Sequence, residues 1–298
     1  MQHYKITIVG AGAVGATTAY ALLLKNLGSE IILVDVNEKR CSGEILDLSD
    51  VLPMSLVNTI KKGTLHDTAT SDIIIIAAGK RQEIGQSRVD LWQENKKIIS
   101  QITDGLQQIQ KNAIVVVVTN PVDPVSLLVK EKLPLHHNKI FSTGTLLDTE
   151  RLKKFLGCHF NIAPESIISH VLGEHGESQF IPWSSTYIDT VSISQFKNFN
   201  SSLQNEFALK VKNEAAGIIA CKGATFFGIA SCVALVCEII IYNKKVALPL
   251  SCYQEKENLY LSVPVVLGKE GILEYLPLIL SQEEQEMLQK SVLCLKGA

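Results

Sequence analysis

Residues 5–15 read Lys-Ile-Thr-Ile-Val-Gly-Ala-Gly-Ala-Val-Gly, and this stretch decides the fold. The run 5–9 is mainly apolar, rich in β-branched residues and of strand length, and a helical pattern follows Gly15. The spacing Gly-x-Gly-x-x-Gly between a strand and a helix is typical of the first turn of a parallel sheet that binds a dinucleotide. An isolated motif of this kind could equally be a plain connecting turn, so the flanking strand and helix carry the prediction.

The glycines and one acidic residue predict how a cofactor would be held. Gly10 permits the tight turn, Gly12 lets the backbone approach a pyrophosphate, and Gly15 lets the helix pack closely on the strand. Asp35 ends the second predicted strand twenty residues after Gly15. A carboxylate there can bond the two ribose hydroxyls and would repel a 2′-phosphate. The predicted cofactor is therefore NAD rather than NADP.

The first half of the chain repeats this alternation of short apolar runs and helical patterns, which predicts an α/β fold with a doubly wound parallel sheet of the Rossmann type. The predicted strands cover residues 5–9, 30–34, 73–77, 113–118 and 139–142. The predicted helices cover residues 14–25, 38–48, 87–110 and 124–131.

The pattern changes after about Asp148. We therefore expect an NAD-binding domain over residues 1–147 and a mixed α+β substrate domain over 148–298. Strands are predicted at 167–172, 186–191 and 260–267, and helices at 201–243 and 281–295. The last of these opens with the Ser-x-x-Glu pattern of a capping box. The apolar tract 229–242 contains Glu238 and is too short to span a membrane, so it is predicted to be a buried helix.

Composition limits the possible partners. The 298 residues are 46% hydrophobic and 19% charged, as suits a compact enzyme, and the formal net charge is −2. Lysine and arginine are scattered, which argues against a nucleic-acid or anionic-membrane partner and favours small molecules. The seven cysteines are odd in number and irregularly spaced, which argues against a disulfide framework and a metal site. No export signal is visible at the N-terminus, so we expect a cytoplasmic protein.

Several segments in order carry a family resemblance. They are the glycine turn 10–15, the polar stretch 78–88, Asn-Pro-Val-Asp at 120–123, Leu-Asp-Thr-Glu-Arg at 147–151 and Gly-Glu-His-Gly at 173–176. Together they resemble the lactate and malate dehydrogenase family over nearly the whole chain. The resemblance implies reversible hydride transfer between NAD and a small 2-hydroxy acid, in a homodimer or homotetramer. It also implies that Val14 and Gly79 lie at the cofactor.

The resemblance further implies the roles of three residues. His175 matches the histidine that gives a proton to the oxo oxygen during reduction and takes it back during oxidation. Asp148 matches its carboxylate partner, which orients the imidazole and stabilises the imidazolium. Arg151 matches the residue that grips the substrate carboxylate with two parallel hydrogen bonds. The alternative for Arg151 is a surface ion pair, for example with Glu150.

Two more residues would act on the reacting oxygen. Arg88 lies in the stretch that matches the family's mobile loop, and loop closure would bring it to that oxygen. Asn120 would hydrogen-bond the same oxygen and help to shape the nicotinamide pocket. Taken alone, the charged stretch could be an ordinary solvated loop and Asn120-Pro121 a common turn.

The choice of substrate depends on two positions. Gln82 stands where malate-specific relatives carry an arginine that pairs with the second carboxylate, and an amide cannot replace it. Thr225 matches the lactate enzymes at a position beside the pocket. The prediction is L-lactate and pyruvate. The alternatives are an L-2-hydroxyisocaproate-type or malate dehydrogenase and, in a different class, an inert NAD-binding protein of this fold.

Allosteric control is expected to be absent. Fructose-bisphosphate-activated enzymes of the family carry an arginine where this chain has Lys153 and a histidine where it has Ile168.

Overall fold

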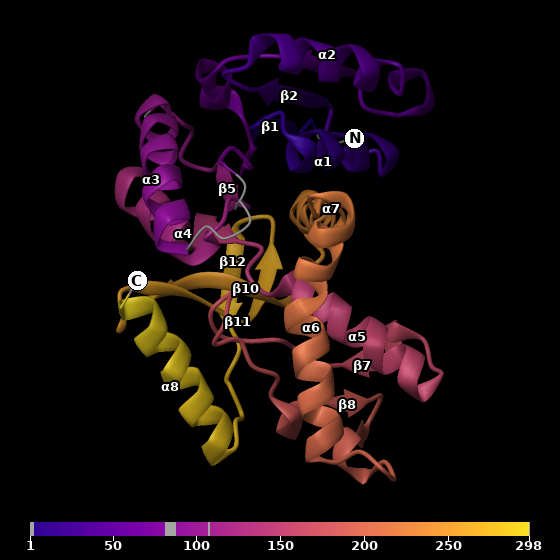
Figure 1. Ribbon diagram of the computed structural model, residues 1–298. Coiled ribbons are helices and arrows are strands. Elements are labelled where there is room, and N and C mark those ends of the chain that lie inside the picture. The colour runs from indigo at the N-terminus through magenta and orange to yellow at the C-terminus, as the bar shows by residue number, and fades with distance from the viewer. Residues whose placement is uncertain (1–2, 81–87, 107, 298) are drawn as a thin grey trace.

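The computed structural model describes residues 3–80, 88–106 and 108–297 (Figure 1). Six parallel strands form its first half: β1 (Lys5–Val9), β2 (Glu30–Val34), β3 (Thr59–Lys62), β4 (Ile73–Ile76), β5 (Ile114–Val117) and β6 (Ile140–Ser142). They lie in the order β6-β5-β4-β1-β2-β3, so the chain reverses its direction across the sheet between β1 and β4. The doubly wound order predicted from the sequence is confirmed. Strand β3 was not predicted, because Thr-Ile-Lys-Lys is mostly polar and lies at the sheet edge.

Three antiparallel strands extend the same sheet beyond β6. They are β10 (Val246–Gln254), β11 (Leu259–Gly268) and β12 (Gly271–Tyr275). Strand β10 joins β6 where Ser251 pairs with Ser142. The sequence predicted β11 but neither of its neighbours. A proline inside a strand argues against that assignment in sequence, and Pro249 lies in the middle of β10 opposite Pro264.

Helices cover both faces of the sheet. The α-helices of the described ranges are α1 (Ala13–Leu24), α2 (Glu38–Ser49), α3 (Arg88–Gly105), α4 (Val122–Lys132), α5 (Leu146–Phe160), α6 (Ser201–Lys222), α7 (Phe227–Ile241) and α8 (Gln282–Lys296), and α6 packs on α5 rather than on this sheet. Residues of α1, α2 and α7 pack in one core cluster, and residues of α3 and α4 pack in the cluster on the opposite face. Short 3-10 helices occupy Leu52–Met54, Leu65–Thr70, His137–Lys139, Pro164–Ser166, Trp183–Ser185 and Ile193–Gln195.

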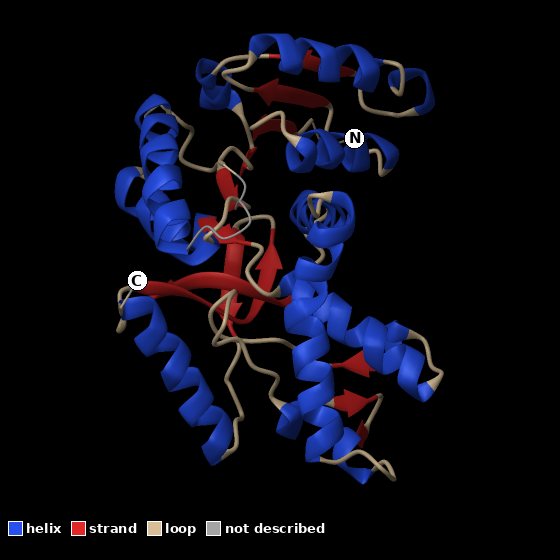
Figure 2. Cartoon of the chain, viewed as in Figure 1, coloured by secondary structure: helices blue, strands red, loops and turns tan. Residues whose placement is uncertain are grey.

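Two predictions about the second half were wrong in detail. The single helix expected over 201–243 is two helices, because Gly223 adopts a left-handed conformation (φ +83°) that ends α6. The strand expected over 186–191 is a tight hairpin of β8 (Tyr187–Ile188) and β9 (Val191–Ser192), which turns at Asp189 with φ +53°. With β7 (Ile167–Ile168) this hairpin makes a small sheet, which Figure 2 shows beside α5 and α6.

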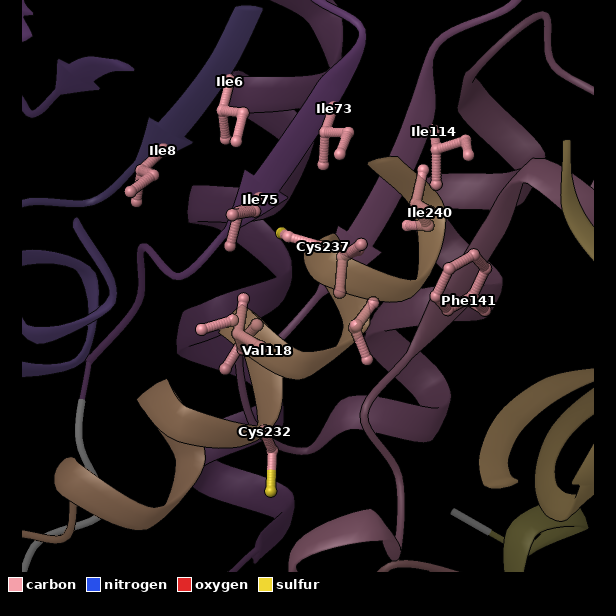
Figure 3. Packing of buried hydrophobic residues seen from close by; sticks show 14 of the residues in the cluster. Ile6, Ile8, Ile73, Ile75, Ile114, Val118, Phe141, Cys232, Cys237 and Ile240 are labelled. Carbon is pink, nitrogen blue, oxygen red and sulfur yellow. The ribbon is translucent and has the colours of Figure 1, made fainter. Parts of the chain in front are cut away.

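The main core joins the two halves of the chain. Figure 3 shows Ile6 and Ile75 of the parallel sheet facing Cys237 and Ile240 of α7, and all four side chains are buried. Each such aliphatic side chain contributes about 1.5–3 kcal/mol on burial. Glu238, the charged residue in this apolar tract, has a partly exposed side chain on α7 and accepts a hydrogen bond from Lys25 Nζ, just after α1, at 2.5 Å. The tract is thus the buried helix that the sequence predicted.

Within the ranges that the structure describes, no helix combines the length and the apolar character that a membrane span requires.

Candidate active site

The carboxyl ends of four neighbouring strands bring the predicted site segments to one edge of the sheet. Parallel pairing aligns β1 with β4, β4 with β5 and β5 with β6. Gly10 follows β1, residues 77–80 follow β4, Asn120 comes shortly after β5, and residues 143–145 lead from β6 into α5. The order of the strands along the sheet reverses between β1 and β4, which is where open α/β sheets bind their ligands.

The glycine turn is tightly packed except where a ligand would approach. Gly10 has φ +114°, and a Cβ atom there would lie 2.6 Å from the backbone nitrogen of Ala78. A Cβ atom on Gly15 would clash with the Gly10 carbonyl oxygen. Gly12, the N-cap of α1, has open space at its Cβ position and no side-chain capping bond. The exposed N-terminus of α1, with Val14 half-buried in its first turn, therefore fits a pyrophosphate.

Asp35 is held beside this turn by three donors. Its carboxylate accepts hydrogen bonds from the backbone nitrogens of Ala11 at 2.7 Å and Asn37 at 2.8 Å, and from Arg40 Nη2 at 2.8 Å. Burial alone would raise the pKa of Asp35, but these bonds and the Arg40 charge outweigh it and hold the pKa below its ordinary value. The carboxylate is therefore ionised at neutral pH and fits the hydroxyls of a ribose. The glycine motif gave no indication that Asp35 would pair with Arg40.

Asn95 of α3 connects the turn after β4, next to Gly79, with Asn120, and sequence reasoning missed it. It is fully buried, and its Oδ1 accepts from the Lys80 nitrogen at 2.8 Å while its Nδ2 donates to the Asn120 carbonyl at 2.7 Å. A Cβ atom on Gly79 would lie 2.6 Å from Thr119, so these turns pack closely. The Asn120-Pro121 peptide bond is cis, and Asn120 is exposed.

Of three other predicted site residues, two lie wholly or partly outside the described residues. Gln82 lies outside the described residues. Arg88 is the first residue of α3, and its side chain also lies outside them. Thr225 lies half-buried in the turn between α6 and α7.

The imidazole, the carboxylate and the guanidinium predicted at the reacting centre form one connected group. Asp148 and Arg151 lie on the first turns of α5, and Arg151 Nη1 donates to Asp148 Oδ1 at 3.1 Å. The other oxygen, Asp148 Oδ2, is 2.9 Å from His175 Nδ1. The side chain of Asp148 is 4% exposed and that of His175 is 28% exposed, so the carboxylate is enclosed while the ring still reaches the surface. Glu150 pairs with Lys153 at 3.0 Å rather than with Arg151.

The hydrogen-bonding of the ring fixes how it can act. An ionised carboxylate is acceptor-only, so Nδ1 carries the proton shared with Asp148 Oδ2. The remaining ring nitrogen, Nε2, is then the one able to exchange a proton with a ligand. The arrangement can therefore deliver or remove a proton next to a buried positive group.

Contacts from several elements hold the loop that carries His175. The Gly173 nitrogen donates to the Ser262 carbonyl of β11 at 3.0 Å, and Gly173 has φ +92°. The hydroxyl of Ser291 on α8 donates to the Ser178 carbonyl at 2.6 Å. The backbone nitrogen of His175 donates to Asp123 Oδ2 at 2.9 Å. Sequence reasoning assigned no role to these supporting residues.

His170 is half-buried, and its Nδ1 lies 2.7 Å from the Ser169 carbonyl. Burial, with a smaller effect from Lys153, lowers the pKa of His170 to about 4, so it is neutral at physiological pH. Over residues 3–80, 88–106 and 108–297, no three histidine, cysteine or acidic side chains gather as a metal ion would require.

Both halves of the chain match known families. Residues 4–142 match the model of the lactate/malate dehydrogenase NAD binding domain, and residues 145–298 match that of the lactate/malate dehydrogenase alpha/beta C-terminal domain. L-lactate dehydrogenase A of Rhizopus oryzae is 39% identical over 295 residues, which cover 99% of this chain and 92% of that protein. An L-lactate dehydrogenase of Clostridium botulinum (strain Loch Maree / Type A3) is 37% identical over 302 aligned positions, with coverage of 98% and 95%.

Solved structures agree with these matches. Minor L-lactate dehydrogenase from Enterococcus mundtii, in a ligand-bound form, has a TM-score of 0.94 at 32% identity and covers 99% of this chain and 97% of its own. A lactate dehydrogenase from a Medee basin deep-sea metagenome library has a TM-score of 0.94 at 28% identity, with coverage of 100% and 98%. The likeness therefore extends over both halves of the molecule.

Proposed function

The chain belongs to the lactate/malate dehydrogenase family, and from this premise we propose that it is an NAD-dependent L-lactate dehydrogenase that interconverts pyruvate and L-lactate. The observation that carries the proposal is the group formed by His175, Asp148 and Arg151, at the edge of the sheet where the glycine turn also lies. NAD is the cofactor of this family's N-terminal domain, and Gly12 and Asp35 would hold its pyrophosphate and ribose.

The protein's part in the reaction is binding and proton transfer. Bound NADH supplies the hydride that reduces the oxo carbon. His175 gives the proton on Nε2 to the oxo oxygen, while Asp148 keeps Nδ1 protonated and stabilises the imidazolium before transfer. In lactate oxidation His175 takes the proton back at the same nitrogen.

Arginine and asparagine groups orient the substrate. Arg151 binds the substrate carboxylate, and because its side chain is 9% exposed the interaction takes place with little competing water. Arg88 and Asn120 act on the oxo oxygen, where their hydrogen bonds stabilise the negative charge that develops in the transition state. These three assignments follow the family resemblance.

The proposed activity is tested by comparing kcat/KM with NADH for pyruvate, oxaloacetate and 2-oxoisocaproate. Pyruvate should be the best substrate of the three. If 2-oxoisocaproate is preferred, the alternative of a dehydrogenase for larger 2-hydroxy acids is correct, and if oxaloacetate is preferred, the malate alternative is correct. Binding of NADH without turnover of any of them would support the inert alternative.

Replacing Gln82 by arginine should shift the preference toward oxaloacetate. The new guanidinium would pair with the second carboxylate and leave an unpaired charge when pyruvate is bound. We expect the oxaloacetate-to-pyruvate ratio of kcat/KM to rise by about 100-fold, which corresponds to about 3 kcal/mol. The charge-matched control is Gln93→Arg on the exposed face of α3, which should leave the ratio unchanged. A constant ratio in Gln82→Arg would mean that residue 82 does not face the substrate.

Replacing Asp35 by serine should weaken the preference for NADH over NADPH. The variant loses the ionised acceptor for the ribose hydroxyls and leaves Arg40 able to attract a 2′-phosphate. We expect kcat/KM for NADH to fall by about 10–100-fold, in line with lost hydrogen bonds to a charged group, and that for NADPH to rise. Asp47→Asn, at an exposed aspartate on α2, is the control. Equal preference in wild type and Asp35→Ser would exclude Asp35 from cofactor recognition.

We further propose a domain division at 147/148 and a homodimer or homotetramer in the cytoplasm. Association is supported by large apolar side chains exposed on outer helices, such as Leu46 on α2 at 73% and Leu209 on α6 at 58%. A reducing compartment is supported by the irregular spacing of the cysteines. We also predict that fructose bisphosphate does not activate the enzyme. At the two positions where activated relatives carry arginine and histidine, Lys153 bonds Glu150 and Ile168 is an exposed apolar residue of β7.

A further inference from the structure

Asp123 is a buried carboxylate that takes no direct part in the proposed hydride and proton transfer. It lies in the first turn of α4 and is 3% exposed. Its Oδ2 accepts a hydrogen bond from the backbone nitrogen of His175 at 2.9 Å, and its Oδ1 accepts one from Ser251 Oγ of β10 at 2.5 Å. One side chain therefore ties together a helix of the NAD-binding half, a strand of the sheet extension and the loop that carries the proposed proton donor.

His175 is thus held by two carboxylates with different attachment points. Asp148 bonds the ring at Nδ1, which sets its tautomer and plane. Asp123 bonds the backbone nitrogen, which sets where the Cα atom and therefore the whole ring stand. A displacement of about 1 Å in a reacting group can lower a rate by about 100-fold, so a bond that sets the position of the His175 backbone bears directly on turnover.

We propose that Asp123 is a positioning residue for His175, which fixes the backbone of the proton donor and favours its charged form by the nearness of a second negative charge. This inference rests on the proposed function only for the part that concerns turnover. Its second part, the protonation of His175, can be measured on the protein without substrate.

The charges around Asp123 support the electrostatic part. Burial raises the pKa of Asp123 to about 6, against the lowering effects of the Ser251 and His175 hydrogen bonds and of the His175 charge, and Glu174 adds to the rise. Above about pH 7 Asp123 is therefore ionised. The attraction between Asp123 and a protonated His175 is reciprocal, so the carboxylate that gains from the imidazolium also stabilises it. On the ring side, Asp148 acts in the same direction and the Arg151 charge opposes it.

The raised pKa of Asp123 predicts that Asp123→Asn changes stability and activity in different ways. The folded-state pKa of Asp123 lies above the ordinary value, so its stabilising contribution is present in acid and is lost as the pH rises through about 6. An asparagine would stay neutral and keep a polar group toward Ser251 and the His175 nitrogen. At pH 8 Asp123→Asn should therefore melt at or above the wild-type temperature. If Asp123 served only to hold the fold, Asp123→Asn would melt below the wild-type temperature at pH 8.

The deciding experiment compares Asp123→Asn and Asp123→Ala with wild type. His175 is titrated by NMR of the histidine ring protons in the protein without substrate, and its signal is assigned by its loss in His175→Asn. The midpoint of His175 protonation in Asp123→Asn should fall by roughly half a pH unit or more. At pH 8, kcat for pyruvate should fall by about 10-fold in Asp123→Asn and about 100-fold in Asp123→Ala, while the NADH dissociation constant stays within about twofold.

Glu284→Gln is the matched control. Glu284 is 6% exposed and, like Asp123, accepts hydrogen bonds from a backbone nitrogen and a serine hydroxyl, but these belong to Ser184 rather than to the His175 loop. It should leave the His175 titration unchanged. If Asp123→Ala does not fold, Asp123→Asn alone decides. An unchanged midpoint of His175 protonation in folded Asp123→Asn overturns the proposal, even if the enzyme is active. A lowered midpoint supports the proposal, even if wild type turns over none of the 2-oxo acids and the proposed function fails.

Discussion

Replacing His175 by asparagine should lower kcat for pyruvate reduction by about 10⁴-fold, the upper range for the loss of a general acid. Asparagine is similar in size and can still bond Asp148, but it cannot give up a proton at neutral pH. Because the glycine turn and Asp35 are untouched, the NADH dissociation constant should stay within about twofold. Stopped-flow absorbance of NADH gives kcat, and quenching of protein fluorescence by NADH gives the dissociation constant.

His66→Asn is the control for this experiment. His66 is exposed in a 3-10 helix of the NAD-binding half, and its replacement should leave kcat unchanged. A His175→Asn enzyme within about tenfold of the wild-type rate would refute the assignment of the proton donor.

Replacing Arg151 by lysine should lower kcat/KM for pyruvate by about 10³-fold, or about 4 kcal/mol. Lysine keeps the positive charge but offers a point charge in place of the planar fork that bonds a carboxylate twice. It also has to replace the Nη1 bond to Asp148, which is 3.1 Å long in the structure. The loss should appear mainly as a higher KM, because the substrate carboxylate is bound in both the ground state and the transition state.

An uncharged carbonyl compound supplies the internal comparison for Arg151→Lys. Reduction of 2,3-butanedione, tested at high substrate concentration, would need no carboxylate anchor, so any rate measured for wild type should change little in the variant. Equal losses for pyruvate and for butanedione would show that Arg151 acts through Asp148 and His175, and not on the substrate.

Much of the fold could be predicted because its first half is built from local patterns. Five of the six parallel strands are short, mainly apolar runs, as in sheets that are buried on both faces, and a turn or loop follows each of them. The sheet extension could not be predicted in the same way. Strand β10 contains Pro249 and joins the parallel strands through the Ser251–Ser142 pair, which no local pattern announces. The break between α6 and α7 depends on Gly223, one residue in an otherwise helical run.

The site residues also differ in whether a local pattern could predict them. His175, Asp148 and Arg151 lie in short motifs, and the structure brings them into contact. The bonds of Asn95 to Asn120 and of Asp123 to His175 connect residues 25 and 52 positions apart, so they depend on the folded arrangement of α3 and α4. The role proposed for Gln82 still depends on the resemblance, since this residue lies outside the described ranges.

The most direct test of the central claim is a crystal structure of the protein with NADH and oxamate, in which an amino group replaces the methyl group of pyruvate. We predict that the oxamate carboxylate is bound by both terminal nitrogens of Arg151, with the amide oxygen within hydrogen-bonding distance of His175 Nε2 and the nicotinamide against the oxamate carbon. Oxamate bound away from Arg151, or a His175 ring that does not reach it, would contradict the account.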